Sequence, residues 1–480
     1  MTGRPLWSGL LVAVGTATVL ICTGLPAWSF FAGGGDGMAM MTTRDTVMML
    51  LIPVGVAAAV VGAGLSRREP PTDEAVGRWR AAPRRRLAAL IVLGVAMIVD
   101  ISKTSSLGFV IPGMRAEYGI SRGEASLLPV AALIGASTAS LLWGWATDHV
   151  GTRTMLFLGG LGFTGTAVCG AMPSFGWNLL MCGLMGSTAG GLVPVVFSLT
   201  ANLVDRSRVA AVGAAIAGVS AAGGYVLASN LADVLIPRYG WRALWLSGAG
   251  TGVLLLALCP LVPNWAVTVR ERADRPAAVD LRTAGRARRA SLSGFGLTAG
   301  FLSLGYVTWL PTLLRSAGLS GDQGTRLLST QAWLALPVVL VLAVAMTRWH
   351  YGTCVALLGL AAAVVIPLSA LALALKWSGP PLTLSLGAVV LLANTMIAAS
   401  LSVTFVWYDG TAGASGPGVI AGASKFGGLV GQPVMGAVGG APVLLVAMAV
   451  AVAGGTLAAG TAVRRTTAFP YEPALALEPG

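Results

Sequence analysis

The chain has 480 residues, of which 55% are hydrophobic and only 10% are charged, and its formal net charge is +13. A soluble protein of this length needs more polar surface, so the composition predicts a membrane protein. Its arginines are spread over short loops without interleaved aromatic residues, which indicates membrane topology rather than nucleic-acid binding. Five cysteines without paired spacing imply neither a disulfide framework nor a zinc site.

Apolar segments long enough to cross a bilayer follow one another along the whole chain. A membrane-spanning helix needs about 20 apolar residues. Fourteen such segments are predicted, over 7–30, 46–66, 87–111, 125–146, 153–172, 176–203, 208–235, 243–263, 292–313, 327–347, 353–374, 382–407, 413–438 and 441–463. The sequence therefore predicts an all-α polytopic membrane protein. A cleavable signal peptide over 1–30 is the alternative to a retained first helix, which the length of the apolar run favours.

The distribution of lysine and arginine predicts the orientation. Of the 31 Lys and Arg residues, 21 fall in the loops and ends that alternate counting assigns to the cytoplasm, 8 fall outside, and Lys103 and Lys425 lie inside spans. Short cytoplasmic loops carry such an excess. We therefore expect a multi-pass protein of the cell membrane, surrounded by lipid, with both termini cytoplasmic.

An internal repeat divides most of the chain into two halves. Pro112 to Ser121 and Pro311 to Ser320 share the spacing Pro, Gly, apolar residue, Ser, at an offset of 199 residues. Two six-helix halves related by a repeat are a recurrent way to build a transporter with a central site. The predicted units are a helix pair (1–67), a basic cytoplasmic linker (68–86), an N-terminal half (87–263), an Arg-rich cytoplasmic loop (264–290), a C-terminal half (291–463) and a cytoplasmic tail (464–480).

The short break between the fourth and fifth spans carries the most informative motif. Its residues 144–153, Gly-Trp-Ala-Thr-Asp-His-Val-Gly-Thr-Arg, resemble the Gly-x-x-x-Asp-Arg-x-Gly-Arg-Arg signature of major facilitator transporters. Gly240-Trp241-Arg242 resembles a further element of that family, and Val99 to Pro112 is most similar to the sugar-porter-related metabolite:proton symporters. The resemblance implies the major facilitator fold, here with two extra N-terminal helices, and secondary transport by alternating access.

By this resemblance, a cytoplasmic gate is expected to consist of Gly144, Asp148, Gly151 and Arg153, with Asp148 facing residues 410–415. His149 replaces the first arginine of the signature, which weakens its charge network. The antiporter motif of the fifth family helix is missing, and this favours uptake over drug export. Neither direction is excluded.

A carboxyl group predicted within the membrane is the candidate for proton coupling. Asp100 lies about 20 Å into its span at 1.5 Å per residue. Charge within hydrocarbon costs about 3 kcal/mol on insertion scales, so such a group is a functional candidate. Lys103, one turn further on the same face, lies close enough to pair with Asp100. A structural ion pair and substrate binding by Lys103 are the alternatives.

Lys425 lies near the middle of the predicted span 413–438, at the depth where facilitators bind solutes. Two lysines facing one cavity favour an anionic substrate such as a carboxylate. In the alternatives, Lys425 extends to the membrane surface or neutralises Asp100. The substrate cavity is expected to include Lys103, Lys425, Tyr225, Asn230, Tyr306, Gln331 and Asn394.

The resulting prediction is a monomeric, proton-coupled carrier that takes up a small organic, anionic solute. No enzymatic activity and no cofactor are expected, since the sequence lacks a P-loop and a catalytic Ser/His/Asp set. Met38, Met40 and Met41 suggest a copper transporter as an alternative, because thioethers bind Cu(I). A transport-inactive membrane scaffold or sensor on the same fold is another, and loss of coupling when Asp100 becomes Asn would exclude it.

Overall fold

The structure is a computed structural model that describes residues 6–33, 43–65, 78–79, 82–168, 172–265, 281–307, 321–349, 351–375, 377, 379–407, 415–438, 452 and 454–457. Its main helices are α1 (Leu6–Ala32), α2 (Thr43–Leu65), α4 (Pro83–Tyr118), α5 (Arg122–Ala125), α6 (Leu127–Val150), α7 (Thr152–Thr166), α8 (Phe175–Leu203), α9 (Arg206–Tyr239), α10 (Trp241–Leu246), α11 (Gly248–Leu258), α13 (Leu281–Gly300), α15 (Gly321–Arg348), α16 (Tyr351–Ala374), α17 (Pro380–Trp407) and α18 (Ser415–Val438). A 3-10 turn, η3 (Cys259–Leu261), follows α11, and a π-helix, η4 (Phe301–Tyr306), continues α13. The all-α prediction is confirmed.

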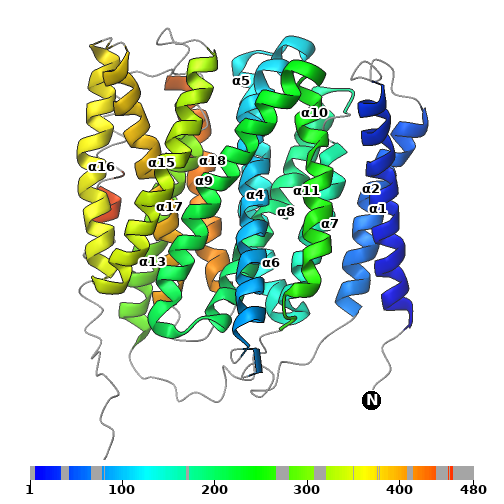
Figure 1. Cartoon of the computed structure of the whole chain (residues 1–480), viewed down its shortest axis with the longest axis horizontal. Helices are drawn as coiled ribbons and strands as arrows, with labels where there is room; N and C mark the ends of the chain where they lie inside the picture. The colour runs from blue at the N-terminus through cyan, green and yellow to red at the C-terminus, as the bar shows by residue number, and fades with distance from the viewer. Residues whose placement is uncertain are drawn as a thin grey trace, which may run out of the picture.

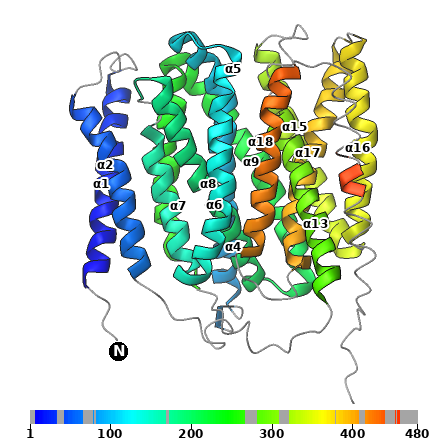
Figure 2. The ribbon, with the colours of Figure 1, turned by 180° about the vertical axis from the view of Figure 1, so that it is seen from behind.

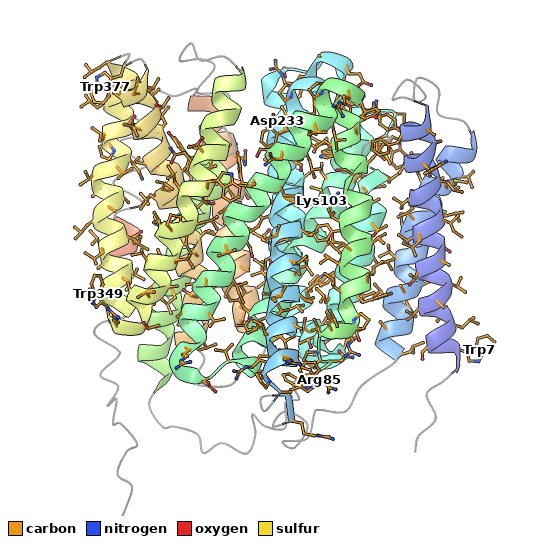
Figure 3. The ribbon with its side chains drawn as sticks, viewed as in Figure 1. Trp7, Arg85, Lys103, Asp233, Trp349 and Trp377 are labelled. Carbon is orange, nitrogen blue, oxygen red and sulfur yellow. The ribbon has the colours of Figure 1, made fainter. Side chains whose placement is uncertain are left out.

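The long helices stand side by side in one bundle (Figure 1). The pair α1–α2 occupies one end of the long axis, α4 to α11 follow, and α13 to α17 form the other end. Seen from behind, α18 lies between α6 and the C-terminal helices (Figure 2). Among the described residues, nine helices are long and apolar enough to cross a membrane. Trp7 and Trp349 lie at the lower helix ends in Figure 3, and Trp377 lies at the upper helix ends. Tryptophans at the two membrane surfaces are expected to lie at such positions.

The first helix of the N-terminal half is longer than predicted at both ends. Pro112 was expected to end it, but α4 continues to Tyr118 and closes at Gly119, which has a φ of 64°. Proline is tolerated inside membrane helices because neighbouring groups satisfy the freed carbonyl. A left-handed residue, in contrast, stops a helix, and glycine adopts that conformation without steric cost. The helix therefore ends at the glycine of the repeated segment rather than at its proline.

Small residues allow α6 and α8 to approach closely. A Cβ atom at Gly186 would overlap the carbonyl oxygen of Ala132, and one at Gly190 would overlap that of Ala136. The Ser140 hydroxyl donates across the same interface to the carbonyl oxygen of Gly190, at 2.8 Å. Membrane helices associate through such close backbone packing and interhelical hydrogen bonds. This interface fixes α6, which lines the space between the two halves.

The contact between α18 and the α13–η4 segment follows the same principle in the C-terminal half. A Cβ atom at Gly427 would overlap the carbonyl oxygen of Leu297, and Gly431 lies against Gly305 of η4. The side-chain amide of Gln432 donates to the carbonyl oxygen of Leu304. This bond satisfies a π-helical carbonyl next to the central cavity. π-Helical turns occur frequently at functional sites.

The N-terminal helix pair packs on the outside of the N-terminal half. Gly15 and Gly55 bring α1 and α2 into backbone contact, and Ile52 covers Gly165 of α7. At the other end of α1, the rings of Phe31 and Tyr239 meet edge to face with centroids 5.6 Å apart. Many of the pair's remaining apolar side chains are exposed. The membrane provides a solvent for such surfaces, so this exposure fits a lipid-facing position.

Candidate functional site

A cavity with a volume of about 110 Å³ lies between the two halves. The N-terminal half contributes residues of α4, α6, α8 and α9, and the C-terminal half contributes residues of η4, α17 and α18. The described lining residues are Met97, Asp100, Ile101, Thr104, Leu107, Pro129, Ala132, Leu133, Ala136, Val193, Ala217, Leu304, Ile397, Leu401, Ala421, Ser424, Lys425 and Gln432. Its walls are mostly apolar, with five polar side chains, as is typical of small-molecule sites.

Asp100 and Lys425 bring opposite charges into this cavity from opposite halves. Asp100 lies in the middle of α4, is only 5% exposed, and its Oδ1 atom has no hydrogen-bond partner within the described part of the chain. Lys425 on α18 is its electrostatic partner. A buried charge is tolerated when it is paired, and the pair still leaves acceptor capacity on the carboxyl group. Neutralisation of Asp100 by Lys425 therefore stays a prediction.

Lys103 points to a different part of the N-terminal half. It lies at mid-height on α4 (Figure 3), and its Nζ atom donates to the carbonyl oxygen of Trp245 at 3.4 Å. Gly248 leaves the space for this ammonium group, because a Cβ atom there would overlap Nζ. Lys103 is not among the described residues that line the cavity. Asp100 and Lys425 thus line one cavity, while Lys103 donates to a carbonyl oxygen at the α10–α11 junction.

The other residues expected in the cavity are dispersed, and the described lining contains none of these five. Tyr225 packs edge to face on Phe109, with ring centroids 6.1 Å apart. Asn230 is exposed, and its amide donates to the carbonyl oxygen of Val226 at 2.7 Å. Tyr306 and Gln331 are buried within the C-terminal half, and Asn394 is half-buried on α17.

Three neutral polar residues of the cavity were not predicted. Thr104 lies one helical turn after Asp100, and that i to i+4 spacing was the available signal. Ser424 directly precedes Lys425, and Gln432 lies further along α18. Each donates a hydrogen bond to a backbone carbonyl, so local sequence does not distinguish them from ordinary helix residues.

The signature loop forms a tight turn between α6 and α7. Gly151 has a φ of 102°, and the residues that follow it bind η3 and the segment directly after η3. The backbone N–H of Arg153 donates to Oδ1 of Asn264 at 3.0 Å, and its side chain donates to the carbonyl oxygens of Val262 and Pro260. Thr152 donates to the carbonyl oxygen of Pro263 at 2.9 Å. Arg153 therefore makes these contacts within the N-terminal half.

The remaining gate residues face the C-terminal half or are buried. Gly144 lies against Gly418 of α18, where an added Cβ atom would be 3.6 Å from the Gly144 Cα atom. Asp148 is 8% exposed. Of its expected partners at 410–415, residues 410–414 lie outside the described residues and Ser415 begins α18; Met38, Met40 and Met41 of the copper alternative also lie outside the described residues. Within the described ranges, no group of three or more His, Cys, Asp or Glu residues could hold a metal ion.

A helical bundle whose two halves enclose a cavity with polar groups from both is the architecture of a membrane carrier. A family model described as Major Facilitator Superfamily matches residues 92–406, and the chain belongs to this superfamily. The predicted fold of two six-helix halves is confirmed, with two further helices before them. Members of this superfamily are transporters, which agrees with the expectation that the chain is not an enzyme.

Curated relatives share about a quarter of their aligned residues with the chain. It is 26% identical over 244 residues to the cis,cis-muconate transport protein of Acinetobacter baylyi, covering 48% of this chain and 58% of that protein. It is 26% identical over 298 residues to the gallate transporter of Pseudomonas putida (52% and 65%) and 28% identical over 291 residues to the gentisate transporter of Corynebacterium glutamicum (55% and 61%). The chain thus spans 58% to 65% of the length of these relatives.

Solved structures share the fold at lower sequence identity. The human organic anion transporter MFSD10 superposes with a TM-score of 0.62 at 18% identity, covering 79% of this chain and 99% of that chain. A D-xylose-proton symporter superposes with a TM-score of 0.62 at 14% identity, covering 77% and 97%.

Proposed function

We propose that this protein couples the movement of a small organic anion to that of protons by alternating access. The observation that carries the proposal is the position of Asp100 and Lys425 in the lining of one cavity, one charge from each half. The relatives named as transporters of muconate, gallate and gentisate support an anionic substrate, because these compounds are carboxylates.

In the proposed cycle, Asp100 and a substrate carboxylate compete for the same ammonium group. When Asp100 is ionised, its carboxylate neutralises Lys425. When Asp100 takes up a proton, Lys425 is left uncompensated and attracts an anion by charge and hydrogen-bond donation. Anion affinity therefore rises as the pH falls through the titration range of Asp100. Asp100 and Lys425 are the titratable groups among the described lining residues, so other charges in that lining do not reverse this sign.

The orientation of the protein in the membrane is part of the same proposal. Arg85 lies at the end of the bundle where α4 begins, and the chain enters α1 at that end (Figure 3). By the excess of basic residues in cytoplasmic segments, we assign this end to the cytoplasm and both termini with it. We further propose that the protein is a monomer of the cell membrane and that it takes up its substrate. Its proposed domain bounds are those predicted from the sequence: 1–67, 68–86, 87–263, 264–290, 291–463 and 464–480.

The proposal is tested with Asp100→Asn in proteoliposomes, using benzoate as the probe anion. We expect the wild-type protein to accumulate benzoate when a proton gradient is imposed. The variant should lose this accumulation by about tenfold or more, since the asparagine amide does not take up and release a proton near neutral pH. It should retain benzoate exchange without a gradient, because the neutral amide leaves Lys425 available. Asp100→Glu, which keeps the carboxyl group, is the matched control.

Gradient-driven accumulation by Asp100→Asn at the wild-type level would refute coupling through this residue. Absence of benzoate exchange in the wild type, together with absence of any carboxylate transport, would refute the anion carrier. That second result would favour a transport-inactive scaffold or a different substrate. The same vesicles also test the direction of transport. When all copies of the protein have one orientation in the vesicle membrane, uptake is compared for benzoate supplied from each side.

A further inference from the structure

The size of the central cavity restricts the ligand to a small molecule. Its volume is about 110 Å³, whereas engineered apolar cavities of about 150 Å³ in other proteins bind benzene. A single six-membered ring is therefore at the upper limit of this state, and a ring with a carboxylate fits only when the halves separate slightly. Thirteen of the eighteen described lining residues are apolar, so most of the ligand surface meets hydrocarbon.

The charges of the cavity restrict the ligand further. Lys425 is the one basic residue in the described lining, and it interacts electrostatically with Asp100, the one acidic residue there. Lys103 donates to the carbonyl oxygen of Trp245 at the α10–α11 junction, away from that lining. A ligand with one carboxylate, bound together with a proton on Asp100, leaves the cavity with no net charge. Among the described lining residues a second carboxylate would find no counterion, and burial of an unpaired charge is strongly unfavourable.

The neutral polar residues of the cavity offer few hydrogen-bond donors to a ligand. The hydroxyl of Thr104 donates to the carbonyl oxygen of Ile101 at 3.1 Å, and that of Ser424 to Ala421 at 2.9 Å. The side-chain amide of Gln432 donates to Leu304. A ring bearing several hydroxyl groups would exchange its bonds to water for contacts with an apolar wall. Each polar group buried without a full set of partners lowers affinity.

We infer that the cavity selects monocarboxylates with a small apolar body, rejects dicarboxylates and polyhydroxylated rings, and moves one anion with one proton in an electroneutral step. This inference rests on the proposed function and narrows it. It also separates this chain from relatives named for muconate, which has two carboxylates, and for gallate, whose ring carries three hydroxyl groups.

The experiment measures benzoate uptake driven by a proton gradient in proteoliposomes containing the full chain. Unlabelled competitors test each feature: cyclohexanecarboxylate keeps one charge and an apolar ring, terephthalate adds a second carboxylate, and 3,4,5-trihydroxybenzoate adds three hydroxyl groups. We expect cyclohexanecarboxylate to compete as well as benzoate, and the other two to require about tenfold higher concentrations or more. In a second measurement, a membrane potential is imposed with a potassium gradient and valinomycin. This potential should leave the initial rate of benzoate uptake unchanged.

Equal competition by terephthalate or trihydroxybenzoate would overturn the inference while leaving proton-coupled anion transport intact. A rate that responds to the imposed potential would overturn the electroneutral step. If no carboxylate is taken up under a gradient, the proposed function itself fails. The three results are therefore distinguishable.

A gain-of-function variant tests the charge argument separately. Thr104→Lys adds an ammonium group to the lining, one helical turn from Asp100. We expect terephthalate to compete about tenfold better in this variant than in wild type, because the second carboxylate gains a counterion. Thr104→Val changes the same side chain without adding charge and should not admit terephthalate. Equal terephthalate competition in both variants would refute the charge argument. If neither variant folds, the competition series on the wild-type protein still tests the inference.

Discussion

At the scale of single residues, Arg242 of α10 joins α4 to the segment that precedes α8, at one end of the N-terminal half. Its guanidinium forms a salt bridge with Glu117 of α4 and donates to the Tyr118 hydroxyl at 3.2 Å. It also donates to the carbonyl oxygen of Met172 at 3.1 Å and lies 4.6 Å from the ring centre of Trp241. A planar guanidinium satisfies several acceptors and stacks on an aromatic ring at once, and lysine does not. The Gly-Trp-Arg motif therefore has a structural role that its sequence did not specify.

Arg242→Lys should reduce the stability of the detergent-solubilised protein by about 2 kcal/mol, because charge-assisted bonds are lost while a positive charge is kept. The measurement is the thermal unfolding midpoint, followed by tryptophan fluorescence. Arg238→Lys is the matched control, since Arg238 is exposed near the end of the preceding helix. Equal midpoints for the two variants would show that the contacts of Arg242 contribute nothing to stability.

At the scale of helices, glycines determine which pairs approach. Gly186 and Gly176 both lie in α8, but a Cβ atom at Gly186 would overlap the backbone of α6, whereas Gly176 has open space around it. Gly186→Val should therefore destabilise the protein by about 3 kcal/mol through overpacking, and Gly176→Val should not. The two variants are compared by the yield of monodisperse protein and by the thermal midpoint. A similar loss in both variants would show that valine in α8 is harmful irrespective of the contact.

At the scale of the whole molecule, the two halves touch along α6 and α18. A Cβ atom at Gly418 would lie 2.5 Å from the carbonyl oxygen of Ser140, and Gly422 lies beside Ser137 and Leu141. Because α4 and α6 run in opposite directions and Gly418 contacts Ser140 and Gly144 in the second half of α6, Gly418 lies on the Arg85 side of the middle of the bundle. Close packing at this seam brings the halves together at that end, and alternating access requires the seam to open.

Gly418→Trp should hold the halves apart near Arg85 and abolish gradient-driven uptake. A single cysteine placed at Ala421, which lines the cavity, should then react about tenfold faster with a membrane-impermeant maleimide added from the Arg85 side. Val419→Trp adds the same bulk at a residue that is 39% exposed and serves as control. Equal labelling rates in the two variants would argue against a seam that opens here.

The sequence by itself determined the helical membrane architecture, the two halves and the superfamily, because hydrophobic segment length and short loop motifs are local properties. It also identified Asp100 and Lys425 as charges within the membrane. Of the seven residues predicted for the cavity, Lys425 alone is in the described lining. Spacing along α4 placed Lys103 beside Asp100, whereas helix packing directs Lys103 to Trp245 and brings in Lys425 from a position 325 residues further along the chain. The rotation of each helix about its axis follows from its contacts with neighbours, and only the tertiary structure decides these.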